Sequence, residues 1–390
     1  MIQKSLNVLI VSPFFFPEPI STGKFNTDLA LALRDSGCKV TVICSHPIYP
    51  KWKVEESNQK INDVSIIRGG KRIHYSKNPT IRRITLELWF SFFVIKQIFK
   101  HQKNADLIIP VFPPSLAFYF VLPFLKKKIK KIGMVHDLQE VYSKDKKGVL
   151  NKSISLLINK VESKALRNCD KLIFLSNEMK NTAKDFYQLS EKRLFVQYPF
   201  SNINLETRTN DLDALLPKNK THIVYSGALG EKQNPSGLYK FYNFASKYLE
   251  NTCFHFFSQG QFFENLKLKN TNQKIRFHNL VPLENLEELY RKSTVQIIPQ
   301  LPNTSKGSLP SKLPNLMASK CKILFITDSD SEIDILFKKY GLSKVVTSWD
   351  NDAILSSLND LLKEKNNTNT QTKVAKELFS IESMTNKILK

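Results

Sequence analysis

The chain has 390 residues, which is enough for two domains of ordinary size, each with its own hydrophobic core. Its apolar content of 42% and charged content of 24% are those of a folded globular protein and exclude a disordered chain. The net charge of +23 is concentrated in residues 1–200, where 33 Lys and Arg stand against 16 Asp and Glu, so we expect an anionic partner, either nucleic acid or the inner leaflet of a membrane.

The five cysteines and the closely spaced pair Asp328 and Asp330 do not indicate a metal site. The cysteines occur at no metal-ligand spacing, and most lie in or beside predicted strands, so we expect reduced core residues of a cytoplasmic protein. Asp328 and Asp330 follow a predicted strand and are expected to cap a helix that starts near Glu332. The apolar run near the start is too short and too rich in β-branched residues for a signal peptide.

A glycine lies where the first predicted strand leads into a helix. Strand 7–12 is followed by a loop rich in Phe and Pro, and the helix is predicted to open at residues 21–24. Nucleotide-binding folds use such a glycine to bring a ligand close to the backbone at the helix N-terminus, so Gly23 is a candidate binding residue. The alternative is a plain strand-to-helix turn in which Gly23 adopts a positive φ.

Two segments of the first half combine apolar and basic residues. Segment 81–100 has a broad apolar face with Arg and Lys at both ends, where lipid headgroups would meet them. Segment 111–125 is shorter than the roughly 20 residues that a membrane-spanning helix needs, and it ends at the basic run 126–131. We interpret both as contacts with a membrane surface. For the second segment, the alternative is a core helix with a solvated basic end.

The most direct sign of chemistry in the first half is the pair His136 and Asp137. They follow the predicted strand 132–135, and α/β sheets bind ligands at the carboxyl ends of their parallel strands. His136 could hydrogen-bond a substrate hydroxyl, and Asp137 could orient His136 or the substrate. The alternative is a pair of loop residues that caps the next helix.

The predicted elements divide into two halves. The first domain is expected over residues 1–198, and residues 199–220, rich in Asn, Asp, Thr and Lys, predict a link. Alternating strands and helices then resume, which indicates a second α/β domain over residues 199–373. A final helix is predicted within residues 374–390.

A second glycine-containing turn follows the predicted strand 222–225. Gly227 would let a pyrophosphate approach the main chain, and Lys232 would neutralise its charge. Further along, Ser311 is predicted to cap a helix, and Lys312 is expected in the loop beside the anion site at that helix start, without core packing. The expected core stripe of this helix and the buried strand after it are Leu313, Leu316, Met317 and residues 323–326.

Four groups of residues resemble the motifs of a known family. They are Gly23; His136-Asp137 with Glu140; Ser226-Gly227-Ala228-Leu229-Gly230; and Pro310-Ser311-Lys312-Leu313 with Asn315. In these places the chain resembles family 4 glycosyltransferases of the GT-B fold, in particular the bacterial branch that builds colanic acid, capsule and O-antigen polysaccharides. Many members carry two glutamates eight residues apart, where this chain has Gly307 and Asn315.

The resemblance implies an α/β architecture of two Rossmann-like domains that face each other across a cleft, with the C-terminal helix packing back on the first domain. The first domain would bind the acceptor and face the membrane, and the second would bind the nucleotide sugar. The catalytic residues would be His136 and Asp137. The implied donor-binding residues are Gly23 and Gly227 near the phosphates, Lys232, Ser311 and Lys312 on them, His278 and Val281 at the base, and Asn315 on a ribose hydroxyl.

The implied activity is transfer of a sugar from a nucleotide-sugar donor to a lipid-linked glycan acceptor in O-antigen or capsule biosynthesis, with retention of anomeric configuration. No metal or other cofactor is expected, and the protein would be cytoplasmic, attached peripherally to the inner face of the cytoplasmic membrane. Because the glutamate pair is missing, the alternative is a catalytically inactive GT-B-like binding or scaffold protein. Nucleic-acid binding is not favoured, since no basic motif interleaved with aromatic residues is present.

Overall fold

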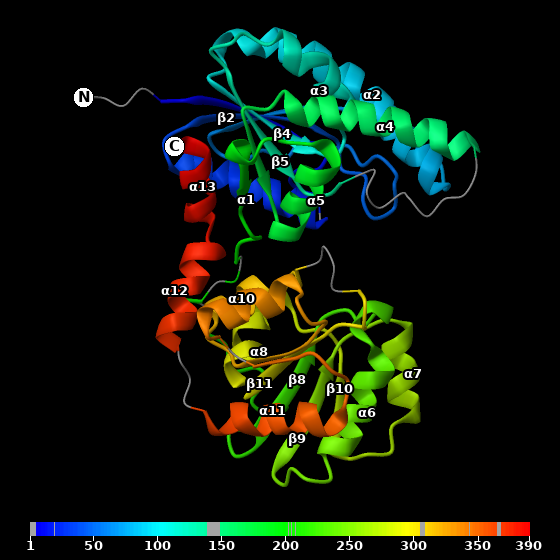
Figure 1. The fold of residues 1–390 in the computed structure, drawn as a ribbon, viewed down its shortest axis with the longest axis vertical. Helices are drawn as coiled ribbons and strands as arrows, with labels where there is room; N and C mark the ends of the chain where they lie inside the picture. Colours follow the sequence, from blue (N-terminus) through cyan, green and yellow to red (C-terminus); the bar gives the residue numbers. More distant parts are fainter. Residues whose placement is uncertain are drawn as a thin grey trace. The chain divides into compact units, whose positions relative to one another are not determined.

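The computed structural model describes residues 5–18, 20–138, 149–201, 203, 205–206, 208–304, 309–342, 344–364 and 368–390. The chain divides into two compact units, Met1–Tyr198 with Ile381–Lys390 and Pro199–Ser380. The division after Tyr198 coincides with the expected boundary between the domains. Among the described residues each unit contains one parallel sheet with helices on its faces, so the α/β architecture is as expected (Figure 1).

The first unit has a seven-stranded sheet in the order β3-β2-β1-β4-β5-β6-β7, all parallel. Because the chain crosses the sheet in opposite directions from β1 to β2 and from β3 to β4, right-handed connections place α1 on one face and α2, α3 and α4 on the other (Figure 1). The elements of this unit are β1 Asn7–Val11, α1 Ser21–Asp35, β2 Lys39–Ser45, β3 Val64–Gly69, α2 Pro79–His101, β4 Leu107–Phe112, α3 Leu116–Val121, β5 Lys130–Val135, α4 Val149–Arg167, β6 Lys171–Phe174, α5 Asn177–Tyr187, β7 Leu194–Val196 and α13 Ile381–Leu389, with 3-10 turns at Gln102–Asn104, Leu122–Phe124 and Glu191–Arg193.

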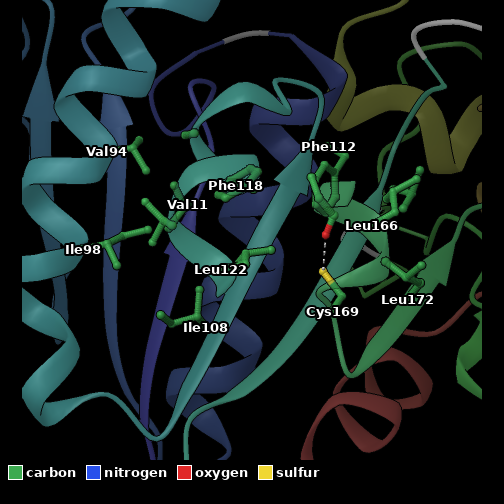
Figure 2. Packing of buried hydrophobic residues seen from close by; sticks show 14 of the residues in the cluster. Val11, Val94, Ile98, Ile108, Phe112, Phe118, Leu122, Leu166, Cys169 and Leu172 are labelled. Atoms are coloured by element: carbon green, nitrogen blue, oxygen red, sulfur yellow. Dashed lines mark hydrogen bonds between the residues drawn. The ribbon is translucent and has the colours of Figure 1, made fainter. Parts of the chain in front are cut away.

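The core of the first unit lies between the sheet and the α2–α3–α4 layer. Figure 2 shows Ile108 and Phe112 of β4 with Phe118 of α3, Val94 of α2 and Leu166 of α4 in this cluster. These side chains are fully buried. Apolar residues recur about every 3.6 positions in the helices and every second position in the strand, so both elements turn an apolar face to this core. All five cysteines are free and buried, which confirms their expected role in the core.

The second unit has a six-stranded parallel sheet in the order β10-β9-β8-β11-β12-β13. The chain direction reverses between β8 and β11, which makes these two strands the switch point of the sheet. The elements of this unit are β8 Thr221–Ser226, α6 Pro235–Ala245, β9 Thr252–Phe257, α7 Gln261–Lys269, β10 Ile275–His278, α8 Leu286–Lys292, β11 Val295–Pro299, α9 Leu313–Ala318, β12 Ile323–Ile326, α10 Glu332–Tyr340, β13 Lys344–Val346, α11 Asn351–Lys363 and α12 Thr368–Leu378, with 3-10 turns at Glu231–Gln233 and Leu283–Asn285.

The C-terminal segment differs from the single helix expected over residues 374–390. It forms two helices, α12 in the second unit and α13 in the first, separated by a break at Phe379 and Ser380. In the first unit, α13 packs on α1, and the Ser383 hydroxyl donates a hydrogen bond to Oε1 of Gln197 at 2.9 Å. The prediction that the chain end returns to the first domain is therefore confirmed, but only for α13.

Candidate functional site

His136 lies at the carboxyl end of β5, as expected, in a mostly apolar setting. Its backbone N–H donates to the carbonyl of Phe112 on β4 at 3.0 Å, and its ring meets the ring of Phe25 edge to face at 4.7 Å between centroids. Burial lowers the pKa of His136 to about 4, so the imidazole is neutral near pH 7. Its Nε2 atom is buried and has no hydrogen-bond partner among the described residues. A neutral imidazole in this state is suited to bonding one hydroxyl.

Asp137 is more exposed than His136 and is tied to the backbone after it. Its Oδ1 accepts a hydrogen bond from the N–H of Leu138 at 2.9 Å. Desolvation raises the pKa of the Asp137 carboxyl, against the opposing charge of Arg83. Glu140, the other acidic residue of this motif, lies outside the described residues, as do Gln139 and the start of the following segment.

Gly23 is a buried residue in the first turn of α1, so the alternative of a turn with positive φ is wrong. A Cβ atom at this position would lie 3.0 Å from Cβ of Glu18 and 3.1 Å from its carbonyl oxygen. Glu18 is itself buried, and its carboxylate accepts the N–H groups of Ile48 and Tyr49. Gly23 therefore lets the preceding loop pack closely on α1, the helix whose Phe25 touches His136.

Gly227 begins the loop after β8 and adopts a φ of +119°, with open space where a Cβ would be. Its N–H donates to the carbonyl of Phe257 at 3.0 Å, and its carbonyl accepts from Oγ of Ser258 at 2.6 Å. These bonds join the carboxyl ends of β8 and β9. The loop thus has the form expected for a close approach of the main chain to a ligand.

Lys312 is not the unpacked loop lysine that we expect from the sequence. Its ammonium lies 4.4 Å from the centroid of the Tyr225 ring and donates to the carbonyls of Ser226 at 2.9 Å and Ile297 at 3.4 Å. These carbonyls are at the end of β8 and in the middle of β11, the two strands of the switch point. Burial lowers the pKa of Lys312 to about 7, because desolvation disfavours the charged form of the amine.

The predicted cap at Ser311 is also wrong. The N-cap residue of α9 is Lys312, whose side chain makes no capping hydrogen bond, and Ser311 is exposed. The helix has six residues, and its core stripe of Leu313, Leu316 and Met317 is fully buried, as expected. Lys306 and Gly307, in the loop before it, lie outside the described residues.

Lys232 and Asn315 are held by different neighbours. Lys232 has an exposed side chain, and its carbonyl accepts the N–H of Leu301, which joins its turn to the loop after β11. Oδ1 of Asn315 accepts from Oγ of Ser201 at 3.0 Å, so in this state the amide contacts the link that begins the second unit. The cap of one other helix was predicted at nearly the right place: α10 begins at Glu332, but Ser331 caps it instead of Asp328 or Asp330.

His278 and Val281 lie at the exit of β10. The carbonyl of His278 accepts the N–H of Ser258 at 3.0 Å, and Ser258 bonds Gly227 in turn, so three neighbouring strand ends are linked. Val281 follows in the loop and is partly exposed. The structure therefore brings Gly227, Lys312 and His278 to one edge of the second sheet.

Sequence reasoning missed Ser258, which links these strand ends, and two histidines, His222 and His255, which lie inside β8 and β9. The available signal was a polar residue within an otherwise apolar strand. It was not sufficient, since strand register decides which histidines meet.

The structure also shows what is not assembled. No group of three or more His, Cys, Asp or Glu side chains converges as a metal site would require within the described part of the chain. A hollow of about 810 Å³ lies at the amino edge of the first sheet, lined by the starts of β1, β2 and β3, on the opposite side from His136. It contains none of the predicted site residues.

Comparison with known proteins agrees with this architecture. Residues 22–204 match the family Glycosyltransferase Family 4. The colanic acid biosynthesis glycosyl transferase WcaI of Escherichia coli K12 is 24% identical over 398 residues, which cover 93% of this chain and 94% of that protein.

Two solved structures share the fold over nearly their whole length. WaaG, a glycosyltransferase involved in lipopolysaccharide biosynthesis, has a TM-score of 0.65 at 12% identity, covering 98% of this chain and 99% of its own. Sucrose-phosphate synthase from Thermosynechococcus elongatus has a TM-score of 0.67 at 14% identity, covering 98% and 97%. The chain is a glycosyltransferase with the GT-B fold, and its residues 22–204 match the Glycosyltransferase Family 4 domain.

Proposed function

We propose that this enzyme transfers a sugar from a nucleotide-sugar donor to a lipid-linked glycan acceptor during synthesis of a bacterial surface polysaccharide such as O-antigen or capsule. The pathways named for WcaI and WaaG, colanic acid and lipopolysaccharide, support an acceptor of this class. The observation that carries the proposal is the outer surface of α2 and its neighbours, which suits attachment to the inner face of the cytoplasmic membrane.

The helix α2 is apolar on two opposite faces. One face buries Leu86, Phe90, Val94 and Ile98 in the core of the first unit. With 3.6 residues per turn, a second set of apolar residues falls on the opposite face, where the side chains are exposed. This set, which we call the exposed α2 face, consists of Ile81, Ile84, Leu88, Phe92 and Phe99.

Neighbouring elements extend the exposed α2 face. The helix α3 packs on α2, and Phe120 of α3 and Phe124 of the following turn are 48% and 73% exposed. Lys126, Lys127 and Lys128 come next and are all exposed, whereas Lys130 and Lys131 begin β5 instead of ending a helix. An apolar face bordered by lysines fits the boundary between acyl chains and anionic headgroups. Within the described residues, no helix has both the length and the apolarity to cross a bilayer.

The proposed chemistry uses groups that bind and position. The bond between the anomeric carbon and the donor phosphate oxygen breaks, a bond from that carbon to the acceptor hydroxyl oxygen forms on the same face, and the hydroxyl proton passes to the donor phosphate. The neutral His136 would hydrogen-bond a sugar hydroxyl, Asp137 would orient the acceptor, and Lys232 and Lys312 would offset phosphate charge. This scheme requires no metal.

The test uses vesicles and separates membrane attachment from folding. Replacing Lys126, Lys127 and Lys128 by Gln should weaken binding to anionic phosphatidylglycerol vesicles by roughly 3 kcal/mol, or about a hundredfold, at about 1 kcal/mol for each cation near the surface. The matched control replaces three exposed lysines of the second unit, Lys218, Lys267 and Lys269, by Gln, with the same change in net charge.

A second pair of variants tests the apolar part. Phe92→Ser with Phe124→Ser should release the protein from vesicles, whereas Leu268→Ser, at a residue that is 85% exposed on α7, should not. Equal co-sedimentation of all variants and the wild type would show that this surface does not hold the membrane. A transfer assay with nucleotide sugars and lipid-extracted acceptors then decides the reaction itself, and absence of transfer from every sugar nucleotide tried would leave the scaffold alternative.

A further inference from the structure

Three histidines on neighbouring strands of the second sheet form a hydrogen-bonded row. His255 on β9 lies opposite Val224 of β8 and Arg276 of β10, and His222 and His278 stand two residues from these partners, on the same face. Nδ1 of His222 lies 3.0 Å from Nε2 of His255, and Nδ1 of His255 lies 3.1 Å from Nε2 of His278. The histidine row therefore crosses the sheet obliquely and ends at its carboxyl edge.

The carbonyl of Pro217 sets the direction of every bond in the histidine row. Its oxygen lies 2.9 Å from Nε2 of His222, and because a carbonyl only accepts, this nitrogen carries the proton. A neutral imidazole has one N–H and one lone pair. Nδ1 of His222 must then accept from Nε2 of His255, and Nδ1 of His255 must accept from Nε2 of His278. All three rings are held as the tautomer with hydrogen on Nε2.

Burial keeps the rings of the histidine row uncharged. It lowers the pKa of His255 to about 2 and that of His278 to about 4, and it lowers the pKa of His222 as well. A second proton on His222 or His255 would also set two N–H groups against each other within the row. The single tautomer therefore persists at neutral pH.

The histidine row leaves one lone pair unused, on Nδ1 of His278. Among the described residues no hydrogen bond to this atom is formed, and the side chain is partly exposed. The ring is held in place by Phe257, which stacks on it with centroids 4.4 Å apart and planes 21° from parallel. The result is a fixed hydrogen-bond acceptor at the edge of the sheet where α/β proteins bind ligands.

We propose that Nδ1 of His278 accepts a hydrogen bond from a ring N–H of the donor's nucleobase, and that His278 thereby selects bases that offer one. This rests on the proposed function, which places the nucleotide at this edge. Strand β10 is two strands from β8, roughly 10 Å, so a base near His278 and phosphates near Gly227 are joined by one nucleotide. Uracil offers N3–H and guanine N1–H. His222 and His255 are positioning residues that keep the proton of His278 on Nε2.

The test compares nucleotides that differ by one methyl group. Calorimetric titration of the full chain uses UDP and GDP and their analogues methylated at uracil N3 and guanine N1. Whichever parent nucleotide binds, its methylated analogue should bind the wild type at least about tenfold more weakly, because the donor is lost and a buried acceptor is left without a partner. This comparison needs no substitution and so does not depend on the folding of a variant.

Variants then assign the selectivity to the histidine row. His278→Phe preserves the stacking on Phe257 and should bind parent and methylated nucleotides equally, whereas His74→Gln, at an exposed histidine of the first unit, should retain the discrimination. In ¹⁵N spectra of the wild type, the His278 ring should show a protonated Nε2 and an unprotonated Nδ1. His222→Phe, which touches no ligand, should disturb this pattern and reduce the discrimination without abolishing nucleotide binding.

The outcomes separate this inference from the function beneath it. If UDP or GDP binds and its methylated analogue binds equally well, the role of His278 is wrong while the donor site stands. A proton on Nδ1 of His278 would likewise overturn the inference. If neither nucleotide binds, both the base selection and the proposed donor site fail.

Discussion

The polar side chains at the carboxyl edges of the two sheets differ in their hydrogen bonding. At the edge of the first sheet, His136 stands alone: its ring packs on Phe25, and its Nε2 lacks a partner among the described residues. At the edge of the second sheet, His278 ends a row of three bonded rings, and Lys312 bonds carbonyls of β8 and β11. The first edge leaves a hydrogen-bonding atom for a substrate, and the second is ordered before any ligand binds.

The difference between the two edges suits the two substrates of a sugar transferase, the nucleotide sugar and the acceptor. A nucleotide is recognised by fixed acceptors and cations, and a site ordered in advance loses less entropy when it binds. An unpartnered buried imidazole is costly for the folded state, so its persistence indicates a use in binding or chemistry. We therefore propose that the donor binds at the second edge and that the reacting hydroxyl lies at the first.

The largest effect is expected from a substitution of His136, at the carboxyl edge of the first sheet. His136→Phe should lower the rate of sugar transfer by about a hundredfold or more, because it removes a hydrogen bond at the reacting centre, and leave the affinity for UDP or GDP unchanged. The measurements are transfer rates at saturating donor and calorimetric affinities of the nucleoside diphosphate.

The matched control for His136→Phe is His74→Gln, since His74 is exposed and belongs to the same unit. An intact transfer rate in His136→Phe would remove the imidazole from the chemistry. A loss of nucleotide affinity equal to the loss of rate would place His136 in the donor site instead, and the contrast between the two edges would be lost.

The next effect compares the two lysines of the second unit. Lys312→Met should weaken nucleotide binding about tenfold and also lower the melting temperature by several degrees, because the ammonium bonds two carbonyls as well as any phosphate. Lys232→Ala, at an exposed side chain, should weaken binding with little change in melting temperature.

The pH dependence of binding distinguishes the same two residues. With its pKa lowered to about 7, Lys312 loses its proton as the pH rises from about 6 to about 8, so nucleotide affinity should fall over this range in the wild type and in Lys232→Ala. In Lys312→Met the fall should disappear. An unchanged pH profile in that variant would show that the Lys312 charge does not meet the phosphates.

The last expected effect is on stability in mild acid. The pKa values of His136 and His278 are lowered to about 4 from an ordinary value near 6.5, so between these values the unfolded chain binds more protons than the folded one. Stability should therefore be fully present above about pH 6.5 and decrease as the pH falls towards 4, by up to about 1.4 kcal/mol per pH unit for each such group.

Melting temperatures of the wild type, His136→Phe and His278→Phe between pH 7 and pH 4.5 test this expectation. Each variant should lose part of the decrease. A decrease that is identical in all three would show that neither His136 nor His278 causes it.

Much of the fold follows from the sequence because local pattern is enough to specify it. Apolar runs such as 323–326 predict buried strands, and alternating strands and helices imply parallel sheets. The short strand β3, Val64–Gly69, was missed, since it is mostly half-buried and carries little apolar pattern. The positions of His136 and Gly227 at strand ends were also predictable, because each follows an apolar run.

Only the tertiary structure decided what these residues touch. The sequence suggested a loop lysine at Lys312, but packing brings its ammonium onto Tyr225 and onto carbonyls of β8 and β11. It suggested an amphipathic segment at residues 81–100, but only burial shows that α2 has one apolar face in the core and another exposed. The histidine row depends on the register of three strands separated by dozens of residues, and register is a property of the assembled sheet that no local pattern contains.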